Sequence, residues 1–163
     1  DGEMKWQRLQ GQVYGRHMHK AEMFAGVDSF IRTCRKNDVP VRIVSHKTRT
    51  NKFDPEKIDL RAAALEWLEK RDFFDDRIIG IKVEDIFFEN DRQKKIHCIS
   101  ELGCSHFIDD LVELFEEPSF PDSVHKILFS TTDVQKPDAP YTVMKSWGHI
   151  TRFLFENAPD VNA

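Results

Sequence analysis

The chain has 163 residues, of which 40% are hydrophobic and 32% are charged, and these proportions exclude a disordered chain and favour one compact domain. The 24 Lys and Arg residues against 28 Asp and Glu residues give a formal charge of -4, which offers no general attraction to nucleic acid. No run of roughly 18 apolar residues is present, so we expect neither a membrane span nor a signal peptide. The three cysteines, an odd number, suggest free thiols and a cytoplasmic protein.

The first half of the chain predicts a helix, a strand and a second helix. Apolar residues at helical spacing predict a helix over 28–37, and the β-branched run 41–44 predicts a strand that ends at Ser45. A polar and basic loop follows Ser45. The pair Asp54 and Pro55, residue types that begin helices, predicts the start of the second helix.

The next part of the chain contains two apolar runs, 78–81 and 86–88, and either or both are candidate strands. A helix is then predicted from Asp91, a capping residue, to Gly103, the residue type best suited to end a helix. The apolar run 104–108 predicts another strand, which Asp109 and Asp110 close.

The last part of the chain predicts a short helix over 111–115, a strand over 126–129 and a polar connection over 130–140. A final amphipathic helix is predicted to carry Val143 and Trp147 on its apolar face, and the residues from 157 onward are expected to form a frayed tail.

The alternation of strands and helices predicts the fold class. We expect an α/β fold in which right-handed β-α-β units build a doubly wound parallel sheet with helices on both faces. Ligands of such folds bind beyond the carboxyl ends of the strands. The residues of interest are therefore those that follow each apolar run: Ser45, Glu89, Asp109, Asp110 and Ser130.

The acidic pair Asp109 and Asp110 is the first candidate for chemistry. Adjacent carboxylates repel each other unless a cation or a shared proton compensates them, and Mg²⁺ prefers oxygen ligands of this kind. The alternative is that both acids cap the short helix that follows, where carboxylates interact favourably with the helix dipole. The sequence alone leaves both interpretations open.

Ser45 and Lys95 extend this candidate site. Lys95 lies near the start of the predicted helix that follows Asp91, and Ser45 ends a different strand. Each residue alone has a simpler interpretation, because a lysine at a helix start is usually solvated and a serine after a strand usually belongs to a turn. A hydroxyl, an ammonium and two carboxylates at one rim of a sheet would form a cradle for a phosphoryl group and its metal.

In this order the motifs resemble those of the haloacid dehalogenase superfamily of phosphohydrolases. The run from Val41 to Ser45 resembles the family's second motif, a hydrophobic strand that ends in Ser or Thr. Lys95, or its neighbour Lys94, resembles the lysine of the third motif, and the run 107–110 resembles the acidic strand end of the fourth. The resemblance covers roughly residues 27–155.

The resemblance implies a Rossmann-like three-layer fold and a Mg²⁺-dependent phosphatase that acts on a small phosphorylated metabolite through a phosphoaspartate. It implies catalytic roles for Ser45 and Lys95. The residues expected to bind the phosphoryl group are Ser45, His46, Lys47 and Lys95, and those expected to hold Mg²⁺ are Asp109 and Asp110.

The sequence departs from the family at its beginning. Residues 1–40 contain neither an apolar strand that ends in Asp-x-Asp nor any Asp-x-Asp, although in the family this motif supplies the nucleophile. We therefore expect an amino-terminal truncation, which leaves the chain as given without activity and two strand edges unpaired. The expected organisation is a helical cap remnant over 1–26, a catalytic core without its first strand over 27–157 and a tail over 158–163.

Other interpretations remain open at this point. One is a non-catalytic domain of the same fold that binds a phosphorylated ligand or a protein partner, and another is a flavodoxin-like or receiver-like domain. His97, Cys98, Cys104 and His106 lie close together in sequence, but their spacing matches no common zinc site, and buried cysteines are the simpler interpretation.

Overall fold

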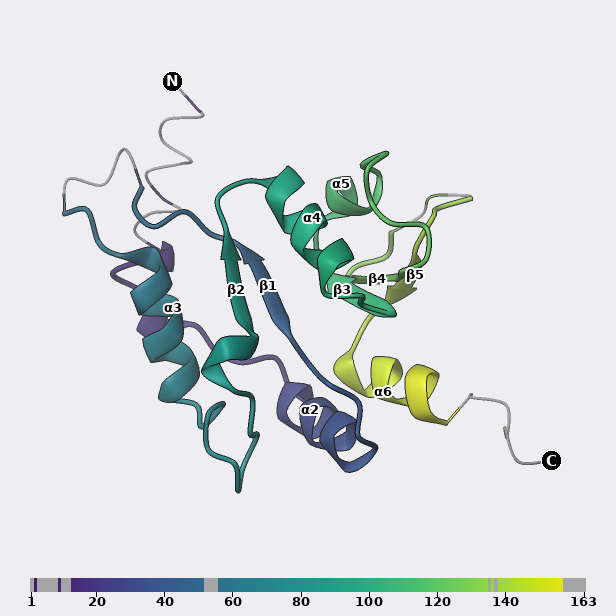
Figure 1. The fold of residues 1–163 in the computed structure, drawn as a ribbon, viewed down its shortest axis with the longest axis horizontal. Helices are drawn as coiled ribbons and strands as arrows, with labels where there is room; N and C mark the ends of the chain where they lie inside the picture. Colours follow the sequence, from purple (N-terminus) through teal and green to yellow (C-terminus); the bar gives the residue numbers. More distant parts are fainter. Residues whose placement is uncertain are drawn as a thin grey trace. The chain divides into compact units, whose positions relative to one another are not determined.

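The computed structural model describes residues 2, 9, 13–51, 56–134, 136 and 138–156 of the chain. The chain divides into two compact units, of which unit 1 comprises residues 1–23 and 41–95 and unit 2 comprises residues 24–40 and 96–163. Both units combine helices with parallel strands, so the predicted α/β class is confirmed, with the strands in two small sheets (Figure 1).

Unit 1 contains a two-stranded parallel sheet. Strand β1 (Ile43–His46) pairs with strand β2 (Ile86–Glu89), and Ser45 lies opposite Phe88 in the register. The other elements of unit 1 are the 3-10 helices η1 (Met18–Lys20) and η2 (Val83–Asp85), the helix α3 (Leu60–Glu69) and the first turn of α4 (Arg92–Glu101).

The strands of unit 1 differ in detail from the prediction. Strand β1 begins at Ile43 and includes Ser45 as its third residue, so the serine lies within the strand and not after its end. Of the two candidate runs, only 86–88 forms a strand, while residues 77–79 form a turn and Gly80 adopts a φ of 75°. A residue with positive φ interrupts an extended strand, which explains why the run 78–81 is not one.

Helix α3 begins at Leu60, and Asp59 is its N-cap. The Asp59 carboxylate accepts hydrogen bonds from the backbone N–H groups of Arg61 and Ala62, each at 3.0 Å. The predicted helix start at Asp54 and Pro55 was therefore wrong, and those two residues lie outside the described part of the chain. An aspartate at this position satisfies donors that the first helical turn leaves unpaired, so it sets where the helix begins.

Unit 2 contains a three-stranded parallel sheet in the order β3-β4-β5. Its strands are β3 (His106–Asp109), β4 (His125–Phe129) and β5 (Thr142–Met144), and its helices are α2 (Val27–Lys36), α5 (Val112–Phe115), α6 (Trp147–Phe155) and the remainder of α4. Ile127 at the centre of β4 is 0% exposed, because strands lie on both sides of it and apolar residues cover it.

The second half of unit 2 holds one element that the sequence analysis missed. Val143 belongs to strand β5 and not to the final helix, which begins at Trp147. The Ser146 hydroxyl accepts a hydrogen bond from the backbone N–H of His149 at 3.2 Å and so caps this helix. A three-residue strand is too short to show period-two alternation, which explains the error.

Helices α2 and α4 follow the prediction closely. Helix α2 buries Phe30, Ile31 and Cys34 on one face, as their helical spacing indicates. Asp91 begins α4 by accepting a hydrogen bond from the backbone N–H of Lys94 at 2.8 Å, and Gly103 follows the helix with a φ of 60°.

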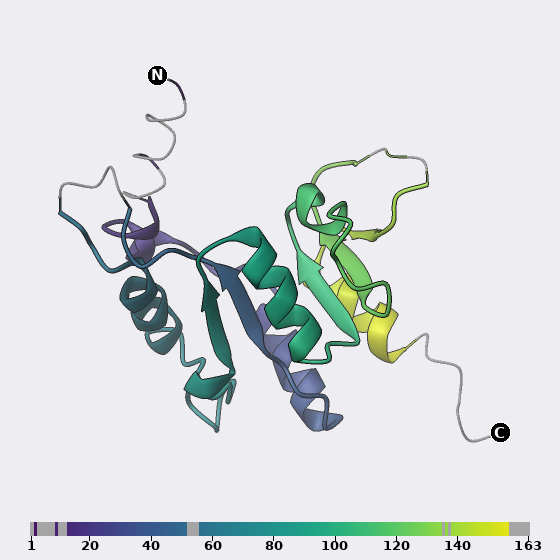
Figure 2. The same cartoon turned by 45° about the horizontal axis from the view of Figure 1, so that its top comes forward.

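Each sheet has a strand edge without a strand partner in the described part of the chain. The edge strands are β1 and β2 in one sheet and β3 and β5 in the other, and each of them pairs on one side only (Figure 2). Open edges carry unpaired backbone N–H and C=O groups that can pair with another strand. Across the described residues, no helix combines the length and the apolar character that crossing a membrane requires.

Candidate functional site

Ser45 lies at the carboxyl end of the sheet of unit 1. Its side chain is half-buried, and none of the described residues forms a hydrogen bond with its hydroxyl. Strand β1, which carries Ser45, is also an edge strand of this sheet. The hydroxyl is therefore available to donate to a ligand that binds beyond the strand ends.

His46 and Lys47 continue from Ser45 toward the loop. The His46 Nε2 atom lies 3.1 Å from the carbonyl oxygen of Asn90, and the backbone N–H of Lys47 donates to the carbonyl oxygen of Glu89 at 2.8 Å. The second bond continues the parallel pairing one residue beyond β1. It therefore holds the backbone at Lys47 in a defined place beside the end of β2.

The Lys47 ammonium is half-buried and has no ion pair with any described carboxylate. Its Nζ atom lies 4.5 Å from the centre of the Tyr14 ring, the distance of a cation–π contact. Burial lowers the pKa of Lys47, because removal from water penalises the charged form. An anion at this position would compensate that charge.

The structure separates the two lysines at the head of α4. Lys94 is exposed, and its Nζ atom lies 3.5 Å from the Asp91 carboxylate. Lys95 is 6% exposed, and among the residues that the structure describes it is the one buried charged side chain. Charged side chains are rarely buried unless they are paired, so burial distinguishes Lys95 from its exposed neighbour Lys94.

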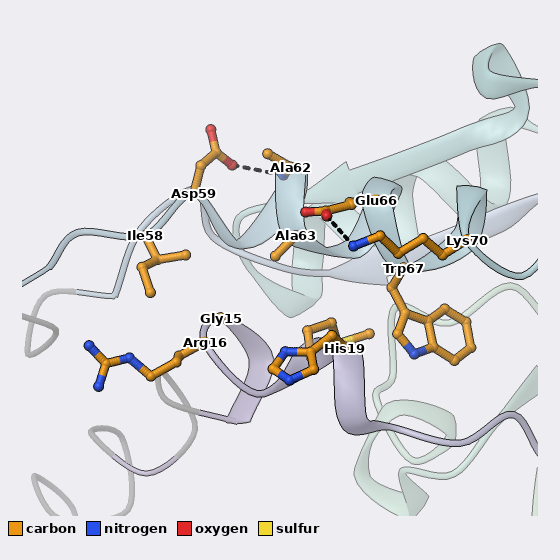
Figure 3. A pocket seen from close by; sticks show the side chains of 11 residues that line it. Gly15, Arg16, His19, Ile58, Asp59, Ala62, Ala63, Glu66, Trp67 and Lys70 are labelled. Atoms are coloured by element: carbon orange, nitrogen blue, oxygen red, sulfur yellow. Dashed lines mark hydrogen bonds and ion pairs between the residues drawn. The ribbon is translucent and has the colours of Figure 1, made fainter.

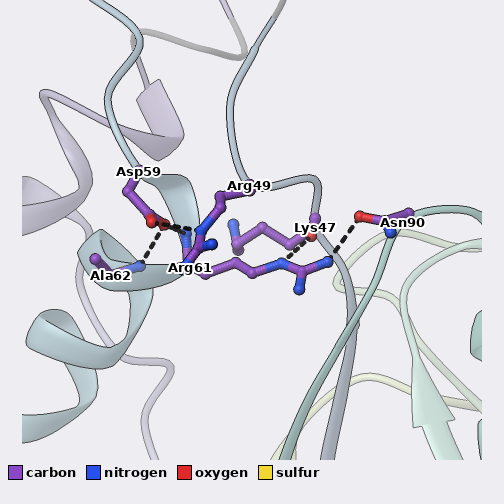
Figure 4. Close-up of polar contacts among 6 residues, drawn as sticks. All are labelled: Lys47, Arg49, Asp59, Arg61, Ala62 and Asn90. Carbon is purple, nitrogen blue, oxygen red and sulfur yellow. Dashed lines mark hydrogen bonds and ion pairs between the residues drawn. The ribbon is translucent and has the colours of Figure 1, made fainter.

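Arg61 is a residue of this region that the sequence analysis missed. From the first turn of α3, its Nε atom donates to the carbonyl oxygen of Lys47 at 2.9 Å, and its Nη2 atom donates to Asn90 Oδ1 at 2.7 Å (Figure 4). Because the helix was predicted to begin at Asp54, Arg61 was not recognised as a residue of its first turn. An Asp two positions before an Arg at a helix start is the signal that would have drawn attention to it.

Asp109 and Asp110 lie at the carboxyl end of the sheet of unit 2. Asp109 is the last residue of β3, and its Oδ1 atom accepts a hydrogen bond from the backbone N–H of Leu111 at 3.0 Å. Leu111 is the N-cap of α5, so Asp109 bonds to the residue at which that helix begins. This contact is in keeping with the capping interpretation of Asp109, and the magnesium interpretation of the pair stays a prediction.

The acidic pair suits magnesium in its chemistry but does not form a full ligand set. Among the described residues, no group of three or more His, Cys, Asp or Glu side chains gathers to hold a metal ion. Mg²⁺ commonly takes one or two protein carboxylates and completes its shell with waters and phosphate oxygens. The donor atoms of Asp109 and Asp110 fit this pattern.

The six residues predicted for the site fall into two sets. One set lies at the carboxyl end of the β1–β2 sheet or at the head of α4, and it consists of Ser45, His46, Lys47 and Lys95, all in unit 1. The other set is the pair Asp109 and Asp110 in unit 2. Each set therefore occupies the end of a parallel sheet where ligands of α/β folds bind.

No family model, no curated protein and no solved structure matches the chain.

A separate cavity of about 380 Å³ lies in unit 1 between the segment around η1 and helix α3 (Figure 3). Two charged residues that line this cavity, Lys70 and Glu66, form an ion pair with each other. The indole Nε1 atom of Trp67 donates to the carbonyl oxygen of Ala21 at 2.9 Å and holds the segment against α3. This packing places residues 18–21, part of the expected cap remnant, against α3 in unit 1.

The histidines and cysteines near α4 and β3 form no zinc site in the described residues. His97 is exposed, and its Nε2 atom lies 3.4 Å from the Oε1 atom of Glu101. Cys98 is buried. The ring centres of His106 and His125 lie 5.4 Å apart on paired strands, and burial, followed by the charge of His125, lowers the pKa of His106.

Proposed function

We propose that this chain is part of a magnesium-dependent phosphohydrolase of the haloacid dehalogenase type, a cytoplasmic enzyme that acts on a small phosphorylated metabolite. The observation that supports the proposal best is the carboxyl end of the β1–β2 sheet. There, a serine hydroxyl without a partner in the described residues lies two residues from a half-buried, unpaired ammonium. Lys95 adds a buried positive charge at the head of α4. Together these groups favour an oxyanion.

The residues of unit 1 would bind and orient the phosphoryl group. The Ser45 hydroxyl would donate a hydrogen bond to one phosphoryl oxygen, and Lys95, with His46, would balance the charge of the others. Donors that are already in place stabilise the charge that develops in the transition state without further rearrangement. Burial strengthens the interactions of Ser45 and Lys95 relative to water, whereas His46 is exposed.

The residues of unit 2 would hold the metal. Asp109 and Asp110 would supply carboxylate oxygens to Mg²⁺. When bound, the metal would supply positive charge at the carboxyl end of the β3–β4–β5 sheet. The role of the two acids in this proposal is to bind the metal and not to transfer a proton.

The chain itself contains no candidate for the nucleophile at the place where this mechanism requires one. Residues 1–40 have no Asp-x-Asp, so we place the attacking carboxylate and its acid–base partner on a further strand outside this sequence. In that mechanism the carboxylate attacks phosphorus, the second Asp protonates the departing alcohol, and water then hydrolyses the phosphoaspartate. The open edges of β1 and β3 support this proposal, because each can accept a parallel strand.

The test uses the protein extended by the coding sequence upstream of Asp1. We expect that segment to encode an apolar strand ending in Asp-x-Asp, and we expect the extended protein to hydrolyse p-nitrophenyl phosphate only with Mg²⁺. Replacement of Asp109 by Asn should lower kcat/KM by about 100-fold or more, since it removes a charged metal ligand. The matched control is Asp122→Asn, an exposed acid of the same unit, which should leave activity unchanged.

Two results would contradict the enzyme. One is a start codon at the position of Asp1, and the other is full activity in Asp109→Asn. A second function, a non-catalytic domain that binds a phosphorylated ligand or a protein partner, is favoured by the absence of Asp-x-Asp in residues 1–40. Binding of phosphate esters without turnover by the extended protein would support that alternative.

A further inference from the structure

We infer that Lys47 and Arg61 form a binding site for a second oxyanion group of the ligand, so that the ligand is a phosphate ester that also carries a carboxylate or another phosphate. This inference rests on the proposed function, because it assumes that Ser45 contacts the phosphoryl group. It gives Arg61 a role in ligand binding, although Arg61 belongs to none of the motifs that resemble the phosphohydrolase family.

The first observation is the charge of Arg61. Its guanidinium is half-buried and donates only to neutral acceptors, the carbonyl oxygen of Lys47 and the Oδ1 atom of Asn90. No described carboxylate pairs with it, and the remaining N–H groups have no acceptor among the described residues. Two of the five guanidinium donors are thus in use, and the others are available in a fixed plane.

The second observation is that the Lys47 ammonium also has no carboxylate partner among the described residues. Arg61 donates to the backbone carbonyl of Lys47, so both residues lie at the carboxyl end of the β1–β2 sheet, and their side chains run alongside each other in opposite directions (Figure 4). The acids of this region are Asp59, Glu89 and Asp91, and none of them forms an ion pair with Lys47 or Arg61 among the described residues. Asp59 accepts from Arg49 Nε at 3.0 Å, and Asp91 accepts from the backbone N–H of Lys94. Two half-buried cations without a carboxylate partner favour a bound oxyanion.

The third observation is the distance of this pair from Ser45. Arg61 bridges Lys47 and Asn90, which lie two residues beyond the paired positions Ser45 and Phe88. At about 3.3 Å per residue of extended chain, the bridge lies up to about 6.6 Å beyond Ser45. A group held at the bridge would therefore be a separate group of the ligand from the phosphoryl group at Ser45.

The competing interpretation is that Arg61 only ties the two post-strand segments together. In that case the Arg61 charge binds no ligand. Loss of the Lys47 ammonium, which forms neither hydrogen bond of Arg61, would then leave the affinity for the probes unchanged. The Lys47→Met variant therefore separates the two interpretations, because it removes the charge and leaves both hydrogen bonds of Arg61 possible.

The experiment measures binding of two stable, non-hydrolysable probes by calorimetric titration in the presence of Mg²⁺, and it uses the same extended protein as the activity test. The probes are propylphosphonate and 3-phosphonopropionate, which share a three-carbon chain and differ by the carboxylate. We expect the extended protein to bind 3-phosphonopropionate about tenfold more tightly, in line with one charge-assisted contact. The third probe, propane-1,3-diphosphonate, tests whether a second phosphonate group increases the affinity as the carboxylate does.

Lys47→Met and Arg61→Gln should each remove most of this preference. The matched control is Lys70→Met, which deletes an ammonium of the same unit that is paired with Glu66, and it should keep the preference. If Arg61→Gln does not fold, as a thermal melt by circular dichroism would show, Lys47→Met still decides the question.

The outcomes for the inference and for the proposed function differ. Equal affinity for all three probes, or a preference that persists in Lys47→Met, would overturn the inference alone. Propylphosphonate binding that is absent, or that is unchanged by Ser45→Ala, would instead contradict the proposed phosphoryl site. Probe binding that depends on Ser45, with a preference that depends on Lys47, supports both.

Discussion

Single residues show how burial distinguishes side chains that residue type alone leaves equivalent. Lys94 and Lys95 are neighbours with the same side chain, and the sequence offers both for one motif. Only Lys95 is buried, because it lies on the inner face of the first turn of α4, while Lys94 reaches solvent and pairs with Asp91. Burial of a charge is costly, so the position of Lys95 is the one that requires an explanation.

Burial also determines the reactivity of Cys34. Its thiol is 2% exposed on the inner face of α2, and desolvation raises its pKa to about 11. Because the thiolate is the reactive form, we expect iodoacetamide at pH 8 to leave Cys34 unmodified in the native protein and to modify it in 8 M urea, roughly complete unfolding conditions for a small protein. Peptide mass mapping measures this directly. Equal alkylation in both solutions would contradict the burial of Cys34.

At the scale of elements, the start of α3 illustrates how a cap overrides a plausible alternative. Asp54 and Pro55 have the residue types of a helix start, but the helix begins at Leu60, because the Asp59 carboxylate is placed to accept from two backbone N–H groups. The shift of the helix start also brings Arg61 into the first turn, within reach of the segment that follows β1.

The cap makes a measurable contribution to stability. Asp59→Ala should lower the free energy of unfolding by about 1 kcal/mol at pH 7, whereas Asp59→Asn, which keeps an accepting oxygen, should lose less. Urea titrations followed by circular dichroism measure both changes. An alanine variant as stable as the wild type would show that the cap is not formed in solution.

The same cap predicts a pH dependence. The hydrogen bond from Ala62 N–H, followed in effect by the contacts with Arg49 and Arg61, holds the pKa of Asp59 below its ordinary value of 3.8. Its stabilisation is therefore fully present above pH 3.8 and is lost as the pH falls through the lower pKa of the folded state. The difference in urea midpoint between wild type and Asp59→Ala should thus shrink between pH 5 and pH 2, roughly the range over which such a group titrates.

At the scale of the whole molecule, the strand edges are the feature with the clearest consequence. Parallel sheets are usually buried and closed in by neighbouring elements, but in the described residues β1 and β3 each pair on one side only. A two-stranded parallel pair such as β1–β2 has little stability of its own. The open edges therefore invite pairing with another strand.

We expect the 163-residue chain in isolation to self-associate through these edges. Light scattering coupled to size-exclusion chromatography should show a molar mass that rises with protein concentration. A low concentration of urea should reduce that mass. An extended protein that fills the edges should be monomeric by the same measurement. A sharp, reversible melt of a monomeric 163-residue chain would contradict this expectation.

The sequence by itself determined the kind and order of most elements. Side-chain periodicity is a local property, so the helices over 27–36 and 92–101 and the apolar strands could be read directly, as could the acids that follow β3. Elements whose signal is weak or short were missed or misplaced, as β5 and the start of α3 show.

Only the tertiary structure decided which strands pair, which lysine is buried and which residues from distant segments meet. Two separate sheets, the bridge from Arg61 to Lys47 and Asn90, and the burial of Lys95 all depend on contacts between residues far apart in the chain. Such contacts follow from packing and from the path of the loops, which periodicity does not encode. The chemistry proposed for this protein was suggested by motifs, but the candidate site for a second anionic group became visible only once those segments were in place.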